Sequence, residues 1–177
     1  MKPTELERFQ AAVLPHLDAA YRLSRYLTRD DHDAQDIVQD ASLRALRHFA
    51  GFRGQGSTEG RVWFLAIVRN TAYTWQRQRR PEQSLTEFDE ELHSEAAGEH
   101  HPEADAVQGD QRAAVRRAID QLPPEFREAI VLRELEGLSY KEMSDVAGVP
   151  VGTVMSRLSR ARKRLQQALW AQVEDPT

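Results

Sequence analysis

Three arginines near the C-terminus are spaced so that they share one face of a helix. Arg157, Arg160 and Arg164 follow one another at steps of three and four residues, and residues at such steps lie along one side of an α-helix. A guanidinium group can donate two hydrogen bonds to a guanine edge, and each such pair contributes about 1–3 kcal/mol of discrimination between bases. The spacing predicts a DNA-reading face, although an isolated helix with a solvated basic face would have the same pattern.

The residues before these arginines favour the DNA-reading interpretation. Ser139 and Glu142 have the spacing of a capping box, and the short helix that they open is predicted to stop at Gly148. A second helix is expected from Val151 to beyond Leu169. Two helices joined by such a turn form a helix-turn-helix, whose second helix enters the major groove. The residues predicted to contact DNA from it are Thr153, Ser156, Arg157, Arg160, Arg162, Lys163 and Arg164.

Aromatic and basic side chains are interleaved in a second stretch. Trp63, Phe64, Tyr73 and Trp75 lie among five arginines between positions 61 and 80. Single-stranded nucleic acid is bound in this way, because bases stack on rings while cations hold the backbone. Trp63 and Phe64 also suit a hydrophobic core, so the spacing alone leaves both interpretations open.

Acidic residues form a third pattern, with Asp33, Asp36 and Asp40 on one helix face. They could hold Mg²⁺ in a small helical nuclease, but no histidine or further acid completes a ligand shell, and such an open set binds divalent ions weakly. A polar face for solvent or a protein partner is the favoured interpretation.

Signatures of catalysis are lacking in the sequence. It contains no Walker A loop, no GxGxxG and no GxSxG motif. The histidines at 32, 48, 93, 100 and 101 lack metal-binding spacing and are expected at the surface. We therefore expect a protein that is not an enzyme and that uses no cofactor and no metal.

Composition is ordinary for a globular protein, with 40% hydrophobic and 29% charged residues. The absence of cysteine excludes disulfides and thiolate metal sites. No apolar run approaches the ~20 residues of a membrane span, and the N-terminus has no signal segment, so a cytoplasmic location is expected.

Charge divides the 177 residues into three parts. Residues 1–80 hold 13 basic and 9 acidic residues, residues 111–177 hold 11 and 9, and residues 81–110 hold ten acids and no base. We predict two helical domains, 1–80 and 110–177, joined by a flexible acidic linker at 81–109.

Helical periodicity without strand-like alternation predicts an all-α fold. An apolar stripe runs from Leu6 to Leu27, and Asp31 or Asp33 is expected to cap the next helix. That helix is expected to bury Ile37, Val38, Ala41, Ala45 and Phe49, and a loop is expected over 51–60. A third helix is expected over 61–79, with a core face formed by Trp63, Leu65, Ala66, Ile67 and Val68. Two more helices are expected over 110–122 and 124–137.

The sequence resembles the extracytoplasmic-function (ECF) group of the sigma-70 family of bacterial RNA polymerase sigma factors along nearly its whole length. Region 2 of that group is matched by DAQDIVQD at 33–40, LRHF at 46–49, FRG at 52–54 and WFLAIVRNT at 63–71. Region 4 is matched by LPPEFRE at 122–128, LRELEGLSYKE at 132–142 and VPVGTVMSRL at 149–158. Two blocks in this order, with a linker between them, are highly specific.

The resemblance implies a promoter-specificity factor that binds core RNA polymerase and promoter DNA, with an anti-sigma factor as a possible further partner. The residues that it places on core polymerase are Asp36, Gln39, Asp40 and Arg44. Together with the aromatic–basic pattern, it predicts −10 element contacts by Phe52, Arg53, Arg61, Asn70, Tyr73 and Arg77. The helix-turn-helix is expected to read the −35 element.

An alternative is a LuxR-like helix-turn-helix regulator, because residues 137–158 alone would fit one. Such a regulator would carry a ligand-binding or receiver domain in place of residues 33–75, so that stretch discriminates between the two functions.

Overall fold

A computed structural model describes residues 3–79 and 106–174, and all the regular structure in these two ranges is helical. We call residues 3–79 the first lobe and residues 106–174 the second lobe. The predicted linker at 81–109 lies largely outside the described residues. Its last four residues belong to a helix that begins at Ala106, earlier than the expected start at residue 110.

The first lobe begins with α1 (Glu5–Val13), a short 3₁₀ turn η1 (Leu14–His16) and α2 (Leu17–Thr28). Thr4 and Glu7 form a capping box at the start of α1. The predicted stripe from Leu6 to Leu27 is therefore not one helix, because Pro15 initiates a separate turn. Leu6 does not join the core, since 59% of it is exposed.

The helix α3 (Asp31–His48) follows, and its first-turn amide groups are capped by Asp30 rather than by Asp31 or Asp33. The side chain of Asp30 accepts a hydrogen bond from the backbone N–H of Asp33 at 2.9 Å. An N-cap needs extended backbone just before the helix, and Asp30 has it. The predicted core residues Ile37, Ala41 and Ala45 are fully buried.

A 3₁₀ turn η2 (Phe49–Gly51) leads to α4 (Ser57–Arg79), which begins four residues before the expected start at Arg61. Gly60, predicted to lie in a loop, is helical, and α1 crosses close to it. A Cβ on Gly60 would lie 2.6 Å from the Ala12 carbonyl oxygen. The core face of α4 is also rotated from the prediction, since Phe64, Leu65, Val68 and Ala72 are buried while Trp63, Ala66 and Ile67 are half-buried.

The second lobe consists of α5 (Ala106–Asp120), α6 (Pro124–Ile130), the π-helical turn η4 (Val131–Leu135), α7 (Tyr140–Ala147) and α8 (Val151–Glu174). Pro124 occupies the first turn of α6, as expected, where its missing N–H leaves no hydrogen bond unmade. Phe126 and Ile130 of α6 face Leu158 and Ala161 of α8 in the core of this lobe.

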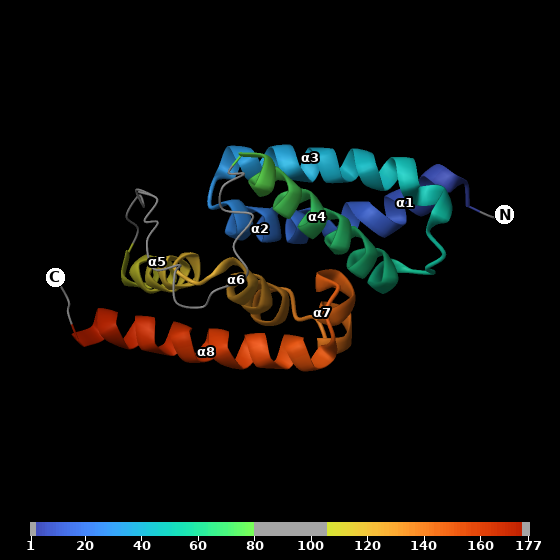
Figure 1. The fold of residues 1–177 in the computed structure, drawn as a ribbon. Helices are drawn as coiled ribbons and strands as arrows, with labels where there is room; N and C mark the ends of the chain where they lie inside the picture. The colour runs from blue at the N-terminus through green and yellow to red at the C-terminus, as the bar shows by residue number, and fades with distance from the viewer. Residues whose placement is uncertain (1–2, 80–105, 175–177) are drawn as a thin grey trace.

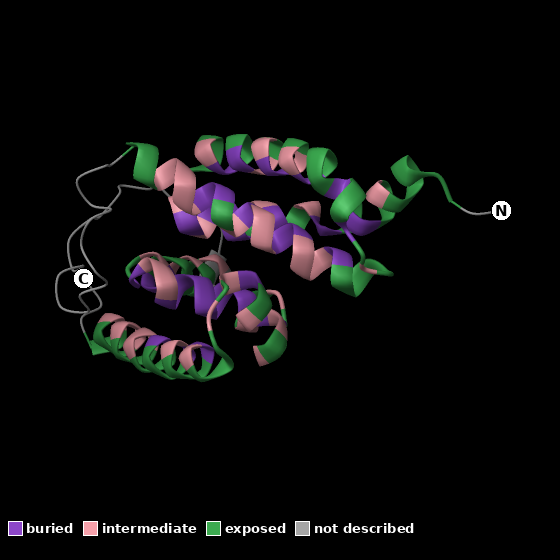
Figure 2. Ribbon diagram, turned by 45° about the vertical axis from the view of Figure 1, so that its right-hand side comes forward, coloured by how far each residue is buried: buried purple, intermediate pink, exposed green. Residues whose placement is uncertain are grey.

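The two lobes pack against each other in layers (Figure 1). Helix α2 lies against α6 and η4, and α4 lies against α7. Helices α3 and α8 form opposite outer layers, and each turns a largely exposed face outward (Figure 2). No helix in the described ranges has the length and apolarity of a membrane span.

Candidate nucleic-acid interface

The predicted helix-turn-helix is formed by α7, a tight turn at 148–150 and α8. Ser139 and Glu142 make the predicted capping box of α7, with reciprocal side-chain and backbone hydrogen bonds of 3.1 and 3.2 Å. Gly148 ends α7 in the left-handed region with φ of 67°, which favours glycine. The hydroxyl of Ser144 donates to the carbonyl of Val149 at 2.5 Å and fixes the turn. The start of α8 is thereby held rigidly.

The outward face of α8 presents a polar row that is suited to DNA. Ser156, Arg160 and Lys163 are exposed, and Thr153 at the start of the helix is half-buried beside them. On a helix of 3.6 residues per turn these positions share one side, opposite the buried Val154, Leu158 and Ala161. This arrangement places two hydroxyls and two cations where a recognition helix contacts bases and phosphates.

Two other arginines of α8 face inward rather than along this row. The Arg164 guanidinium lies over the ring of Phe126, 5.2 Å from its centroid. Arg157 is half-buried, lines a small crevice with Glu125 and Glu128, and acts electrostatically on Glu128. Both lie beside the row of Ser156, Arg160 and Lys163 and not in it. The helix face with three arginines that the spacing predicts is therefore only partly exposed.

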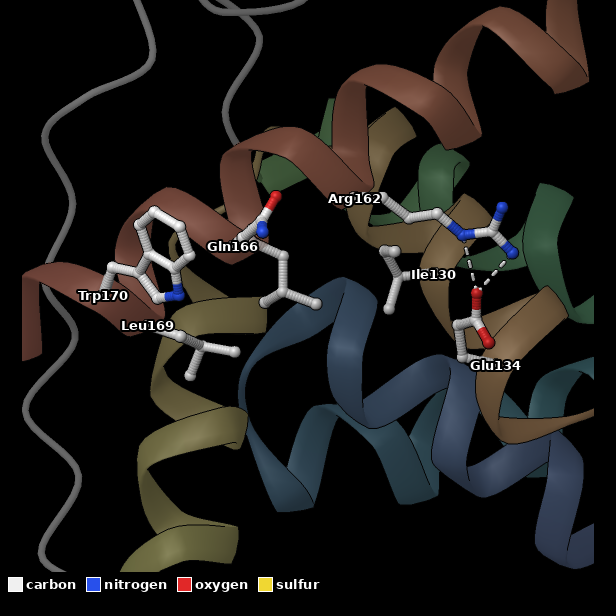
Figure 3. A pocket seen from close by; sticks show the side chains of 7 residues that line it. Ile130, Glu134, Arg162, Gln166, Leu169 and Trp170 are labelled. Carbon is white, nitrogen blue, oxygen red and sulfur yellow. Dashed lines mark hydrogen bonds and ion pairs between the residues drawn. The ribbon is translucent and has the colours of Figure 1, made fainter. Parts of the chain in front are cut away.

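Arg162 lies on the opposite flank and borders a groove of about 260 Å³ between α8 and the end of α6 (Figure 3). Its guanidinium forms an ion pair with Glu134 at 2.6 Å. Leu165, Leu169 and Trp170 continue the wall of this groove. Arg162, expected among the DNA contacts, is engaged within the second lobe and turned away from the row of Ser156 and Arg160.

Phe52, predicted at the −10 site, is buried in an aromatic cluster rather than presented as a stacking platform. Its ring centroid lies 4.8 Å from that of Trp63 and 5.5 Å from that of Phe49. Phe9 packs edge-on against Phe49 at 5.4 Å. The cluster supports the loop at 53–56, of which Arg53 is exposed.

Further contacts fix this loop and the start of α4 next to it. Glu59 accepts a hydrogen bond from the backbone N–H of Gln55, and Gly54 packs on the ring of Phe52, where a Cβ would not fit. The buried His16 has its Nε2 atom 2.8 Å from the carbonyl of Ser57, to which it donates, and 3.0 Å from its hydroxyl. Burial lowers the pKa of His16, and the nearby Arg61 lowers it further, while the hydrogen bond to Ser57 opposes them.

The remaining predicted −10 residues lie along α4 but not on one exposed face. Asn70 and Arg77 are exposed. Arg61 and Tyr73 instead contact the second lobe: Arg61 pairs with Glu142 at 3.1 Å, and the Tyr73 hydroxyl donates to Glu128 at 3.3 Å. Burial raises the pKa of Tyr73 well above its usual range, and Glu128 adds to this effect.

A third surface lies on the outward side of α3. The predicted polymerase-contacting residues Asp36 and Gln39 are exposed there, and Asp40 and Arg44 form an ion pair of 3.1 Å at its edge. Two leucines share this face: 48% of Leu43 and 51% of Leu46 are exposed. Exposed leucines among charged residues are typical of a protein-binding surface.

The nuclease alternative would need Asp33, Asp36 and Asp40 to converge on a metal. Both carboxylate oxygens of Asp33 instead accept hydrogen bonds from Arg79 at 2.9 Å, and Asp40 is paired with Arg44. Among the described residues, no group of three metal-ligating side chains comes together.

Sequence reasoning missed several residues that the structure places at these surfaces. Leu43 and Leu46 could have been recognised from the sequence as exposed apolar residues. They do not lie on the helix face that carries the buried Ile37, Ala41 and Ala45. Glu128 also carried a signal, since it and Arg127 interrupt the apolar run from Phe126 to Leu132, and a charge in such a run requires a buried partner. His16 offered no signal in the sequence, because its partner is 41 residues away.

Comparisons with known proteins match one family model in each lobe. The chain matches the family model "Sigma-70 region 2" over residues 12–82 and the model "Sigma-70, region 4" over residues 112–165. The region 2 match falls where a LuxR-like regulator would carry a different domain, so that alternative is wrong.

Individual relatives give the same result. The chain is 36% identical over 159 residues to the ECF RNA polymerase sigma factor SigE of Mycolicibacterium smegmatis, covering 89% of this chain and 60% of that protein. It is 38% identical over 149 residues to the ECF RNA polymerase sigma-E factor of Escherichia coli, covering 81% and 76%.

A solved structure is also similar, that of the Bartonella quintana sigma factor RpoE in complex with the anti-sigma factor NepR. The TM-score is 0.70 at 28% identity, over 91% of this chain and 96% of that one. The helix-turn-helix, the all-helical first lobe and these similarities lead to one assignment. The protein belongs to the ECF group of RNA polymerase sigma factors, which are non-enzymatic transcription initiation factors.

Proposed function

We propose that the two lobes read two different elements of a promoter. The second lobe places Ser156, Arg160 and Lys163 of α8 in the major groove of the −35 element. The observation that supports this most directly is their exposed row on a helix whose start is fixed by the capped α7. Thr153 lies beside the row and contacts a neighbouring phosphate, whereas Arg157 would first have to leave the crevice that it lines with Glu125 and Glu128.

The first lobe acts on the −10 element through α4 and the loop before it. Asn70 and Arg77 offer an amide and a cation at the surface, and Arg53 stands on the loop supported by the aromatic cluster. Arg61 and Tyr73 add a cation and a ring once they are released from the second lobe. Rings and cations together suit the unpaired strand of a melted promoter.

Core polymerase binds the outward face of α3, with Asp36 and Gln39 providing polar contacts and Leu43 and Leu46 the apolar contact area. Central apolar residues surrounded by charge are the usual composition of a stable protein interface. The protein acts in the cytoplasm, where core polymerase and promoters are found.

We also infer that an anti-sigma factor can regulate this chain. The support comes from the Bartonella relative, whose structure was solved with one. Such a partner would bind across the two lobes and cover both DNA-binding surfaces.

Run-off transcription with purified core polymerase on a library of promoter sequences tests the proposed promoter function. We expect transcripts only when the protein is added, and a preferred −35 and −10 sequence among the transcribed templates. Absence of protein-dependent transcripts would overturn the proposal.

Core binding is tested separately with the variant Leu43→Asp/Leu46→Asp. It should lower affinity for core polymerase at least tenfold, in the range of losses at interface hot spots, about 1.4 kcal/mol or more. Leu6→Asp is the matched control, because Leu6 is an equally exposed leucine on α1. Equal losses for both variants would place the polymerase contact elsewhere.

A further inference from the structure

His16 is a buried titratable residue of the first lobe that the proposed promoter contacts do not use. It is the last residue of the 3₁₀ turn η1, which Pro15 initiates, and 9% of it is exposed. Burial lowers its pKa, so the imidazole is neutral at neutral pH and has one N–H donor. A polar group is costly to bury unless it is hydrogen-bonded. The partner of His16 therefore indicates what this residue does.

That partner is Ser57, the first residue of α4. The Nε2 atom of His16 is within hydrogen-bond distance of both the carbonyl oxygen and the hydroxyl oxygen of Ser57, at 2.8 and 3.0 Å. One ring nitrogen thus engages the main chain and the side chain of the same residue. Because the two residues are 41 positions apart, this contact ties the start of α4 to η1.

Close packing holds the same turn of α4 at a second point. Gly60 is three residues after Ser57 and lies on the same side of the helix. It packs against Ala12 of α1 so closely that a Cβ would not fit, and its backbone N–H donates to the carbonyl of Gly56 at 3.2 Å. The segment from Ala12 to His16 therefore contacts the first turn of α4 twice, by packing at Gly60 and by hydrogen bonding at Ser57.

The loop at 53–56 lies directly before this contact and joins two anchored residues. Phe52 at its start is buried in the aromatic cluster, and Ser57 follows its end. Gly54 and Gly56 lie between them, and Gly56 has a φ of 96°, in the region that favours glycine. Glycines leave the backbone many accessible conformations, so the conformation of this loop depends on the residues that hold its two ends.

Glu59 connects the interior of the loop to α4. Its carboxylate accepts a hydrogen bond from the backbone N–H of Gln55. Since Glu59 lies two residues after Ser57 on α4, a displacement of the start of this helix would move Glu59 and the loop with it. His16 differs from Glu59 because it belongs to another part of the lobe and holds the helix from outside.

We propose that His16 is a positioning residue for −10 recognition: by holding Ser57 it fixes the start of α4, and with it the loop that presents Arg53. This inference rests on the assignment of that loop to the −10 element. His16 is buried, so it acts on DNA only through the loop. A single good base contact changes affinity by roughly 5- to 150-fold between bases, and a displaced loop would lose part of this preference.

His16→Ala tests the proposal in the holoenzyme formed with core polymerase. The measurement is the affinity for fluorescent promoter fragments that share one −35 element and carry each of the four bases in turn at every −10 position. The variant should lower the ratio between the preferred base and the others at least about fivefold at one position, the lower end of the range for one base contact. Affinity for core polymerase and the base preference in the −35 element should equal those of the wild type.

Two conservative variants separate positioning from packing. The side-chain amide of glutamine can place an N–H donor near the position of the histidine Nε2 atom, so His16→Gln should retain the −10 preference of the wild type. The asparagine side chain is one methylene shorter and does not reach the Ser57 carbonyl, so His16→Asn should behave like His16→Ala. This pair also decides the question if His16→Ala does not fold.

Ile37→Val is the control for a general loss of stability. It removes one methyl group from a fully buried residue near the start of α3, which destabilises the first lobe without altering a residue that contacts the loop. This variant should keep the −10 preference of the wild type.

The outcomes distinguish this inference from the proposed function. If the wild-type holoenzyme has no −10 preference, or if Arg53→Ala leaves it unchanged, the assignment of the loop fails and this inference fails with it. If Arg53→Ala alters the preference but His16→Ala and His16→Asn do not, the positioning role alone is overturned. It is also overturned if His16→Gln or Ile37→Val loses as much preference as His16→Asn, because the effect would then come from packing or stability.

Discussion

The Nε atom of Arg69 lies 2.7 Å from Oε1 of Glu128, and these two residues are 59 positions apart in different lobes. Burial raises the pKa of the Glu128 carboxyl, and Arg69 counteracts this by stabilising the charged form. A carboxylate buried to this degree is costly unless it is paired. The pair therefore makes the stability of the second lobe depend partly on the first.

Substitution of Arg160 tests base reading by α8. Arg160→Ala should weaken binding of the holoenzyme to its −35 element by about 1–3 kcal/mol and relax the preference at one base pair. Binding to a set of −35 variants, measured by fluorescence anisotropy, reports both effects. Lys163→Ala is the comparison, since a phosphate contact should weaken all sequences equally. An equal loss on all sequences for Arg160→Ala would assign Arg160 to a phosphate instead.

Substitution of Asn70 tests the −10 surface of α4. Asn70→Ala should reduce promoter opening, seen as weaker permanganate reactivity of unpaired thymines, with a loss of about 1–3 kcal/mol for one base contact. Affinity for core polymerase should not change. Gln78→Ala, at another exposed position of α4, is the control. If Asn70→Ala lowered core affinity, this part of α4 would face the polymerase.

His16 predicts a pH dependence of stability. Its pKa is lowered in the folded protein, so below about pH 6.5 the unfolded chain binds the proton more readily. The contribution of His16 to stability should be complete above this pH and should be lost as pH decreases toward the lower folded pKa. Urea unfolding at about pH 7.5 and pH 5.5 measures the difference.

The variant His16→Gln retains a donor for the Ser57 carbonyl but does not titrate, so it should lose this part of the pH dependence. His32→Gln, at an exposed position, should keep it. A wild-type pH dependence that persists in His16→Gln would assign the effect to other groups.

Two helical glycines should respond oppositely to alanine. Gly60→Ala places a Cβ 2.6 Å from the Ala12 carbonyl oxygen, and such overpacking against backbone typically costs 1–3 kcal/mol, roughly the range for a crowded core. Gly152→Ala in the first turn of α8 meets no atom within 4 Å and should stabilise by about 0.5–1 kcal/mol. Thermal unfolding followed by circular dichroism compares them, and equal shifts would exclude the proposed steric role of Gly60.

Local signals in the sequence were sufficient for the helix caps and the turn of the second lobe. Ser139, Glu142, Gly148 and Pro124 act on neighbouring residues, and each has the predicted role in the structure. The start of α4 was missed because glycines at 54, 56 and 60 indicate a loop, whereas Gly60 lies within α4 at a point where only a residue without a Cβ fits against Ala12 of α1. Helix periodicity also placed Arg162 near the DNA row, but Glu134 holds it on the other flank.

Contacts between the lobes had no local signature. Each crossing pair joins residues 59 to 114 positions apart, and a single sequence does not indicate which arginine pairs with which glutamate. The family resemblance identified the two regions and their roles, but it carried no information on how the lobes are arranged in the free chain. Only the structure brought Arg61 and Tyr73 against acids of the second lobe.

The position of α3 and α8 on opposite outer layers (Figure 1) has a kinetic consequence. Leu43 and Leu46 are accessible while the lobes remain together, so recruitment by the transcription machinery does not have to wait for a rare conformation. The association rate constant then reflects the first encounter alone. In a stopped-flow experiment, this accessibility would produce a binding phase whose rate rises in proportion to the enzyme concentration.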